Sequence, residues 1–333
     1  MATLAQVRAE LALIEKKIDS CRVYSDIDGF ELASNKRQSL QAQLAIIEEK
    51  LKERGRIGEF GLDSPLGEIE KRRKRSAVVV GELAQLPLMS QGKVGFPNVL
   101  LRSSVFGIWS PDKAGQALLR EPIACENGYT ILFTGHRLWQ KDFLLMAAVL
   151  RMAADDLSRP VVISIRQLLK TLGLDDGATN YESLLASLAR LHGASIAIQH
   201  EQNEVSFDGR LLSYKLFTSD QVRMLEFTVD VKWAQLFGIA RWTALHFDKL
   251  AGLGKKELAI WLAGFLATHD GKRPVTLDRL LQASGVTTER RFFRRGVRAA
   301  LAECVQRGLL LAGELTDEDE LIFQPLRMPR LCI

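Results

Sequence analysis

The sequence lacks the residue patterns that mark common metal and enzyme sites. Its 333 residues include four cysteines without a CxxC pair, and five histidines without an HxH or HExxH pattern. There is no GxxxxGK[ST] phosphate-binding loop and no GxSxG nucleophile motif. We therefore expect no metal, no cofactor and no catalytic activity. The scattered cysteines favour a reducing cytoplasm over a disulfide framework.

Long apolar runs are lacking as well. No segment reaches the roughly 18 consecutive apolar residues of a membrane-spanning helix, so we expect no membrane partner. The N-terminus is amphipathic and contains acidic residues, unlike a signal or transit peptide. The composition, 47% hydrophobic and 26% charged, is that of a globular protein. A net charge of +5 permits nucleic-acid binding, so the positions of the basic residues must decide.

Residues 1–55 carry two helical stripes. Apolar residues recur at 3- and 4-residue steps from Leu4 to Cys21, and again in a shifted phase from Leu40 to Leu51. A break at residues 24–29 separates the two stripes. Two helices folded back as a hairpin would bury both stripes, and a coiled coil with another chain would do so equally well.

Residues 56–95 lose this periodicity and are expected to form a basic linker. Its basic cluster comprises Lys71, Arg72, Arg73, Lys74 and Arg75. These side chains either contact DNA phosphates beside a binding site or belong to a solvated, flexible tether.

Residues 96–238 mix helices and strands. A hairpin is expected at 123–133, and the strong elements after it are a helix at 139–150, a strand at 161–165 and a short helix that ends at Gly173. A Thr179–Glu182 capping box then opens a helix that Gly193 ends in a left-handed conformation. Three strands follow, at 194–200, 210–217 and 222–231.

Residues 239–333 repeat this order. The expected elements are a helix at 253–269, a stub strand at 274–276, a short helix at 277–283 closed by Gly285, a helix at 287–306, and wing strands at 309–312 and 321–323. Helix, strand, helix, helix and hairpin is the order of a winged helix. We therefore predict an α+β fold with two tandem winged-helix domains after an N-terminal helical, coiled-coil-like segment.

The helix at 287–306 carries the clearest functional signal. Its basic residues are Arg290, Arg291, Arg294, Arg295 and Arg298. At about 100° per residue they lie within an arc of about 140°, beside an apolar stripe that can pack on the core. We expect Thr287 or Thr288 to cap this helix and to lie at the DNA with the arginines.

Such a charge run often marks no more than a solvated basic face. Here the arginines lack the acidic partners four residues away that usually accompany one. Guanidinium groups can bind guanine O6 and N7 or grip phosphates, so we favour a helix that enters the DNA major groove.

Two further charge patterns indicate different roles for the two domains. The turn between the last two strands is acidic, with Glu314, Asp317, Glu318, Asp319 and Glu320. Because these charges repel phosphates, we expect the turn to point away from DNA. The matching helix of the first domain is not basic: its expected outward positions are Glu182, Ser183, Ser187 and Arg190. We expect the first domain to pack or dimerise and the second to read DNA.

Residues 85–311 resemble the TrfA family of plasmid replication initiators. The matching segments are Phe96-Pro97-Asn98, Arg102-Ser103-Ser104-Val105-Phe106, 168–173, 180–191, Val275-Thr276-Leu277 and 288–294. The resemblance implies tandem winged helices that bind repeated double-stranded sites, called iterons, at a plasmid origin in the bacterial cytoplasm. It also implies recruitment of the host helicase machinery, and a monomer–dimer equilibrium in which dimers are inactive.

A short peptide in the linker resembles a second known motif. Gln85, Leu86, Pro87, Leu88 and Met89 look like the QL-x-L-F peptide with which bacterial proteins bind the replicase sliding clamp. In an exposed, extended segment, Gln85 would fix the register while Leu86, Leu88 and Met89 fill pockets. Pro87 and Met89 depart from the usual form, which should weaken binding.

Two other functions fit parts of the same sequence. A dimeric winged-helix transcriptional repressor would bind a palindrome rather than direct repeats. A nicking replication enzyme would need a tyrosine beside a metal-binding histidine pair. None of the four tyrosines has that context.

Overall fold

The computed structural model describes Leu86 and residues 92–110, 113, 116–126, 128–157, 159–200, 203–239 and 241–326. The chain divides into two units, Met1–Gly81 and Glu82–Ile333, and the described residues all belong to the second. The helical segment expected at 1–55 and the basic cluster at 71–75 lie outside the described residues. So do Gln85, Leu88 and Met89 of the clamp-like peptide.

The described unit has an α+β fold whose sheets are antiparallel. The first part of the chain contains β1 (Lys93–Pro97), α4 (Asn98–Leu101), β2 (Ala117–Ile123), β3 (Tyr129–His136), α5 (Gln140–Met152), β4 (Val161–Ser164), α6 (Ile165–Thr171), α7 (Ala178–Gly193), β5 (Ser195–His200), β6 (Asn203–Arg210), β7 (Ser213–Ser219), β8 (Val222–Thr228) and α8 (Trp233–Ile239). The second part contains β9 (Trp242–His246), α9 (Phe247–Ala251), α10 (Glu257–Ala267), β10 (Val275–Thr276), α11 (Leu277–Ser284), α12 (Arg290–Gln306), β11 (Leu310–Leu315) and β12 (Glu320–Pro325). None of these helices is long and apolar enough to cross a bilayer.

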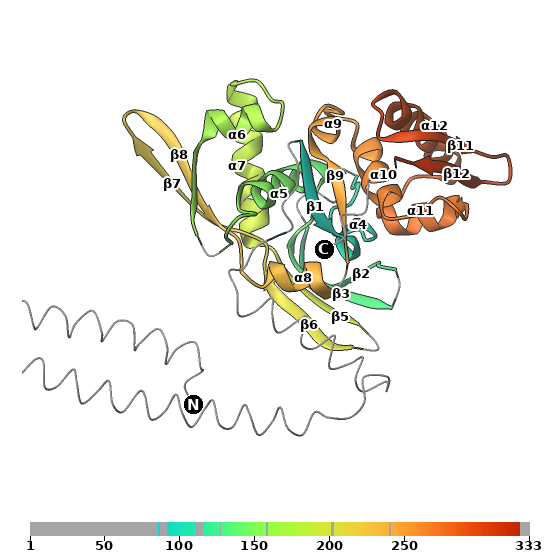
Figure 1. Cartoon of the computed structure of the whole chain (residues 1–333), viewed down its shortest axis with the longest axis horizontal. Coiled ribbons are helices and arrows are strands. Elements are labelled where there is room, and N and C mark those ends of the chain that lie inside the picture. The colour runs from blue at the N-terminus through green and yellow to red at the C-terminus, as the bar shows by residue number, and fades with distance from the viewer. Residues whose placement is uncertain are drawn as a thin grey trace, which may run out of the picture. The chain divides into compact units, whose positions relative to one another are not determined.

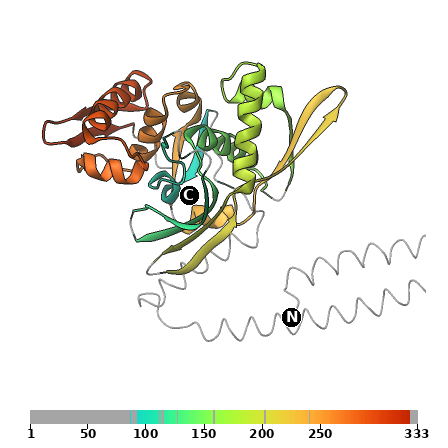
Figure 2. The same cartoon turned by 180° about the vertical axis from the view of Figure 1, so that it is seen from behind.

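The same topology occurs twice along the chain. In the first repeat α5, β4, α6 and α7 lead to the hairpin β7–β8, and the sheet has the order β4-β8-β7. In the second repeat α10, β10, α11 and α12 lead to β11–β12, with the order β10-β12-β11. The first repeat has an inserted hairpin, β5–β6, which extends the sheet β2-β3-β5-β6. Figures 1 and 2 show α6, α7 and the β7–β8 hairpin apart from α11, α12 and the β11–β12 hairpin.

The short helices of the two repeats begin and end with the same chemistry. The Ser164 hydroxyl accepts a hydrogen bond from the Gln167 N–H at 3.2 Å, and the Thr276 hydroxyl accepts one from the Arg279 N–H at 3.4 Å. Each cap is the last residue of its short strand, so the helix begins directly after the strand. Gly173 and Gly285 then follow the helices with φ of +71° and +74°, a region that favours glycine.

Other local predictions were wrong. Helix α7 begins at Ala178 after Gly177, without a side-chain cap, so the Thr179–Glu182 capping box does not form. Gly193 is the last residue of α7 and does not have a positive φ. Helix α12 begins at Arg290 after Glu289, again without a side-chain cap. Thr287 and Thr288 therefore precede the helix and do not cap it.

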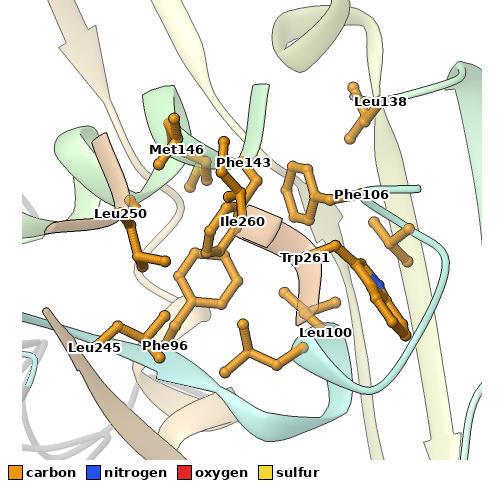
Figure 3. Close-up of a cluster of buried hydrophobic side chains, with 14 of the residues drawn as sticks. Phe96, Leu100, Phe106, Leu138, Phe143, Met146, Leu245, Leu250, Ile260 and Trp261 are labelled. Carbon is orange, nitrogen blue, oxygen red and sulfur yellow. The ribbon is translucent and has the colours of Figure 1, made fainter. Parts of the chain in front are cut away.

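The core continues across the boundary that the sequence analysis placed between residues 238 and 239. Strand β1, which precedes the first repeat, pairs with β9, which precedes the second, in a register from Lys93↔His246 to Pro97↔Trp242. The Phe96 ring is fully buried and meets the Phe143 ring edge-on, with centroids 5.0 Å apart. Leu245 and Ile260 of the second part lie in the same cluster (Figure 3). The two repeats thus share one hydrophobic core.

Candidate nucleic-acid interface

One side of α12 is packed on the protein, as the sequence predicts. The buried residues are Phe293, Val297, Ala300, Leu301 and Cys304. The Cys304 thiol lies 3.4 Å from the Ala259 carbonyl oxygen of α10, and burial raises its pKa to about 12. Cys304 is therefore a packing residue that stays a thiol. This anchored side fixes which side of α12 faces solvent.

The solvent side of α12 combines arginines with small residues. Arg291, Phe292, Arg295, Arg298, Ala299 and Ala302 are exposed. Residues seven apart lie about 20° from each other around a helix. Three lines therefore run along this face: Arg291 with Arg298, Arg295 with Ala302, and Phe292 with Ala299. We call these six residues the outer face of α12.

The position of the acidic turn, which was expected to point away from DNA, is set by contacts with α12. The turn between β11 and β12 lies against the arginine side of α12. Arg290 donates hydrogen bonds to Asp319 at 2.9 and 3.0 Å, and also binds Asp278 of α11. The hydrogen bond to Asp319 raises the pKa of Arg290. Asp319 has a φ of +62°, and this left-handed residue shapes the turn that holds its carboxylate at the helix.

Arg294 is bound to the same turn. Its Nη2 donates to the carbonyl oxygens of Thr316 at 3.1 Å and Asp317 at 3.3 Å. Its Nε lies 2.8 Å from Asp319 Oδ1, although the two atoms are not aligned for a hydrogen bond. The side chain is 31% exposed. Arg290 and Arg294 therefore hold the acidic turn on α12 and have few donors left for another partner.

Arg291 and Arg295 form fewer contacts with acidic residues than Arg290 and Arg294 do. Their guanidinium carbons lie 4.6 and 5.7 Å from the centroid of the Phe292 ring. Arg291 also pairs with Glu289 at 2.8 Å, but both side chains are exposed, so solvent weakens the pair. Among the described residues, no carboxylate forms an ion pair with Arg295.

Arg298 is intermediate between these two groups. It forms one ion pair, at 3.3 Å, with the highly exposed Asp317. Such pairs contribute little and exchange easily with solvent or another anion. The structure thus divides the predicted arginines into Arg290 and Arg294, which serve the turn, and Arg291, Arg295 and Arg298, which face outward.

The corresponding helix of the first repeat has no comparable face. Ser187 and Arg190 were expected on the outward side of α7, and this was wrong. Ser187 is buried, and Arg190 donates to both carboxylate oxygens of the fully buried Asp142 of α5 at 2.8 and 2.9 Å. This pair joins α7 to α5. The one arginine of α7 therefore serves the core of the first repeat.

The position of the second repeat depends on contacts that the sequence analysis missed. The Ile108 N–H donates to the Ser284 carbonyl at 3.1 Å, at the turn between α11 and α12. The Trp109 ring lies so close to Gly285 that an added Cβ would be 2.7 Å away. Only glycine fits here, because the loop at 103–110 packs against the turn that follows α11. No local sequence pattern links these distant segments.

A polar network joins the same parts of the chain. Arg279 of α11 binds both carboxylate oxygens of Glu126, at the β2–β3 turn, with one contact at 2.7 Å. Arg279 also lies 3.0 Å from His269 Nε2, and His269 Nδ1 lies 3.0 Å from the Phe265 carbonyl oxygen. Burial lowers the pKa of His269. The neutral ring, with its proton on Nδ1, fits both contacts.

The described part of the clamp-like peptide is not exposed. The Leu86 side chain is 5% exposed, and its N–H donates to the Ala154 carbonyl at 2.9 Å. The exposure expected at Leu86 is therefore wrong, because the core and the residues after α5 hold this side chain and its N–H. A clamp could bind Leu86 only after it left the core.

Comparisons with known proteins add little to this picture. No family model and no curated protein matches the sequence. A structure of selenomethionine derivatives of domains 2 and 3 of RctB is similar, with a TM-score of 0.43 and 10% identity, over 62% of this chain and 83% of that chain. A structure of RctB residues 155–483 has a TM-score of 0.39 and 10% identity, over 74% and 94%. Likeness at this level assigns neither a function nor a detailed fold.

Proposed function

We propose that this chain is a plasmid replication initiator in which residues 239–333 form a winged helix that reads double-stranded DNA with α12. Residues 96–238 form a second winged helix that positions the first or mediates dimerisation. The protein has no catalytic activity of its own. The observation that carries the proposal is the outer face of α12, where Arg291, Arg295 and Arg298 are exposed beside Ala299 and Ala302.

The dimensions and chemistry of this face suit a major groove. A helix with its side chains is about 10–12 Å wide, and the major groove is about 12 Å wide. Ala299 and Ala302 leave room for the backbone to come close to the base edges. The arginines supply paired N–H donors that match guanine O6 and N7. The packed stripe on the opposite side holds these donors in place.

The acidic turn fits this proposal because two of its five acidic residues are already paired with arginines of α12. Asp317 and Asp319 are paired with Arg290, Arg294 and Arg298. These pairs reduce the repulsion between the carboxylates and nearby phosphates. Contact with the DNA then rests on the helix, while the turn supports it from the side.

The choice of an initiator over a repressor rests on the sequence resemblance to the TrfA family. An initiator binds direct repeats at an origin and recruits the host helicase machinery. A sliding clamp is a further partner, provided that Leu86 is released from the core. Monomers would initiate, and dimers would be inactive.

A binding and footprinting experiment on the DNA that flanks the gene tests this function. We expect protection of tandem direct repeats beside an AT-rich tract, with binding lost on replacement of Arg291 and Arg295 together. Arg290→Ala is the matched control, because Arg290 is on the same helix but bound to Asp278 and Asp319. A protected palindrome at a promoter would favour the repressor, and the absence of any protected site would contradict DNA reading altogether.

A further inference from the structure

Phe292 is unusual among the aromatic residues of the described chain. It is 45% exposed, whereas the other described aromatic side chains are buried or half-buried. Its neighbour Phe293 fills the core side of α12. Two adjacent residues point about 100° apart on a helix, so one of them must leave the core. Nothing in the packing of the second repeat requires the outward one to be aromatic.

The place of Phe292 on the outer face gives this exposure a meaning. The guanidinium groups of Arg291 and Arg295 lie on its ring, at 4.6 and 5.7 Å from the centroid. Ala299 lies seven residues on, along the same line of the helix. An apolar strip therefore runs directly beside the two arginine lines. A surface that touched only phosphates would not need such a strip.

The major groove offers one apolar partner for this strip in unmodified DNA. Guanine presents two acceptors there, whereas thymine presents the C5 methyl group. An aromatic ring flanked by guanidinium groups therefore matches a thymine next to a guanine. We infer that Phe292 reads the C5 methyl group of a thymine adjacent to a guanine that Arg291 or Arg295 contacts. This inference rests on the proposed function and deepens it.

Phe292 would act in two ways at this site. Its ring would cover the methyl group and remove it from water. Its ring would also hold Arg291 and Arg295 in place before binding, because cation–π contacts restrict their side chains. A leucine at this position keeps the first role and loses the second, whereas an alanine loses both.

The test replaces each thymine of the footprinted site by uracil, which lacks the methyl group, and measures affinity by fluorescence anisotropy. At one position the wild type should bind about fourfold more weakly, which corresponds to about 0.8 kcal/mol for one buried methyl-sized group. Phe292→Ala should bind the two duplexes equally. Phe292→Leu should keep the difference but bind both duplexes more weakly.

Leu311 provides the matched control, because it is an exposed apolar residue of the same repeat, 53% exposed on β11. Leu311→Ala should keep the full difference between thymine and uracil. Thermal melting should show that each variant is folded, since both side chains are at the surface.

The outcomes separate this inference from the proposed function. Suppose that Arg291→Ala and Arg295→Ala weaken binding but no replacement of thymine by uracil changes the affinity. Phe292 then does not read a methyl group, but α12 remains the helix that reads DNA. The same holds if Phe292→Ala keeps the uracil effect, or if Phe292 contacts another protein and its variants leave DNA binding unchanged. If the arginine variants bind normally, the proposed role of α12 fails.

Discussion

The helices α7 and α12 occupy the same place in two repeats of one topology, yet they use their arginines in opposite ways. Arg190 of α7 points inward and is paired with the fully buried Asp142. Arg291, Arg295 and Arg298 of α12 point outward. The two repeats also share a cap and a left-handed glycine around the preceding helix.

Topology alone therefore does not identify a helix that reads DNA. The caps, the glycines and the sheet order preserve the backbone arrangement in both repeats. The direction of the arginine side chains decides what the helix can bind. On this basis, we propose that the first repeat is a structural partner and that the second repeat reads DNA. Four sets of variants test the roles of the two repeats and of their junction, in order of the expected effect.

Replacing Asp142 by Ala should give the largest effect, on stability rather than on DNA binding. The change leaves Arg190 half-buried without its partner and removes the bond from the Trp139 N–H to Asp142. Breaking such a buried pair costs about 3–5 kcal/mol. Urea unfolding should show this loss, while the affinity of the folded fraction for DNA stays the same. A loss below about 1 kcal/mol would show that the pair does not support the first repeat.

Replacing Arg291 or Arg295 by Ala should give the opposite pattern. Each loss of a base contact should weaken binding by about 1–3 kcal/mol, without a change in the melting temperature. Arg290→Ala should leave specific binding nearly unchanged, because its donors already bind Asp278 and Asp319. Titrations at one fixed salt concentration check both expectations. Equal losses of DNA affinity for all three variants would mean that contacts with the acidic turn do not determine which arginines bind DNA.

Replacing Asp317 and Asp319 together by Asn should strengthen DNA binding at low salt. The change removes two negative charges near the phosphates, together with the ion pairs that they form with Arg290, Arg294 and Arg298. Each additional phosphate contact should steepen the dependence of log affinity on log salt by about 0.9. Glu318→Gln in the same turn is the control, since no ion pair to α12 involves it among the described residues. Weaker binding by the double variant would show that the aspartates position the arginines for reading.

The smallest effect concerns the junction between the repeats. Burial lowers the folded-state pKa of His269, with Arg102 and Arg279 acting in the same direction. Stability from the neutral ring is therefore complete above the unfolded pKa of about 6.5. It falls as the pH drops through the folded pKa, because the unfolded chain takes up the proton first. The free energy of unfolding, measured from pH 7.5 to 5, should decline less steeply in His269→Gln than in the wild type. An unchanged slope would exclude His269 as the titrating group.

Local signals predicted the order of the main elements within each repeat, but not β1, α4, α8, β9 or α9. Gly173 and Gly285 end the short helices in the left-handed conformation, and the apolar stripe of α12 is buried. The predicted start of α12 was wrong, because Thr287 and Thr288 both have side chains that commonly cap a helix. The chain places Glu289 at the boundary without a side-chain hydrogen bond. Helix ends depend on small local differences that sequence patterns do not resolve.

Long-range contacts could not be predicted in the same way. The acidity of the β11–β12 turn is visible in the sequence, but its direction depends on the left-handed Asp319 and on the register of the hairpin. Similarly, the inward position of Arg190 depends on Asp142, 48 residues away. These contacts decide which arginines are free, so the candidate site needed the structure.

Photo-cross-linking compares the two helices on DNA most directly. Ala299 of α12 and Ala186 of α7 are both exposed, so a photoreactive side chain at either position should leave the fold intact. On the same footprinted duplex, we predict cross-links to bases from position 299 and none from position 186. Cross-links from position 186 alone would contradict the account, because they would make α7 the helix that enters the groove.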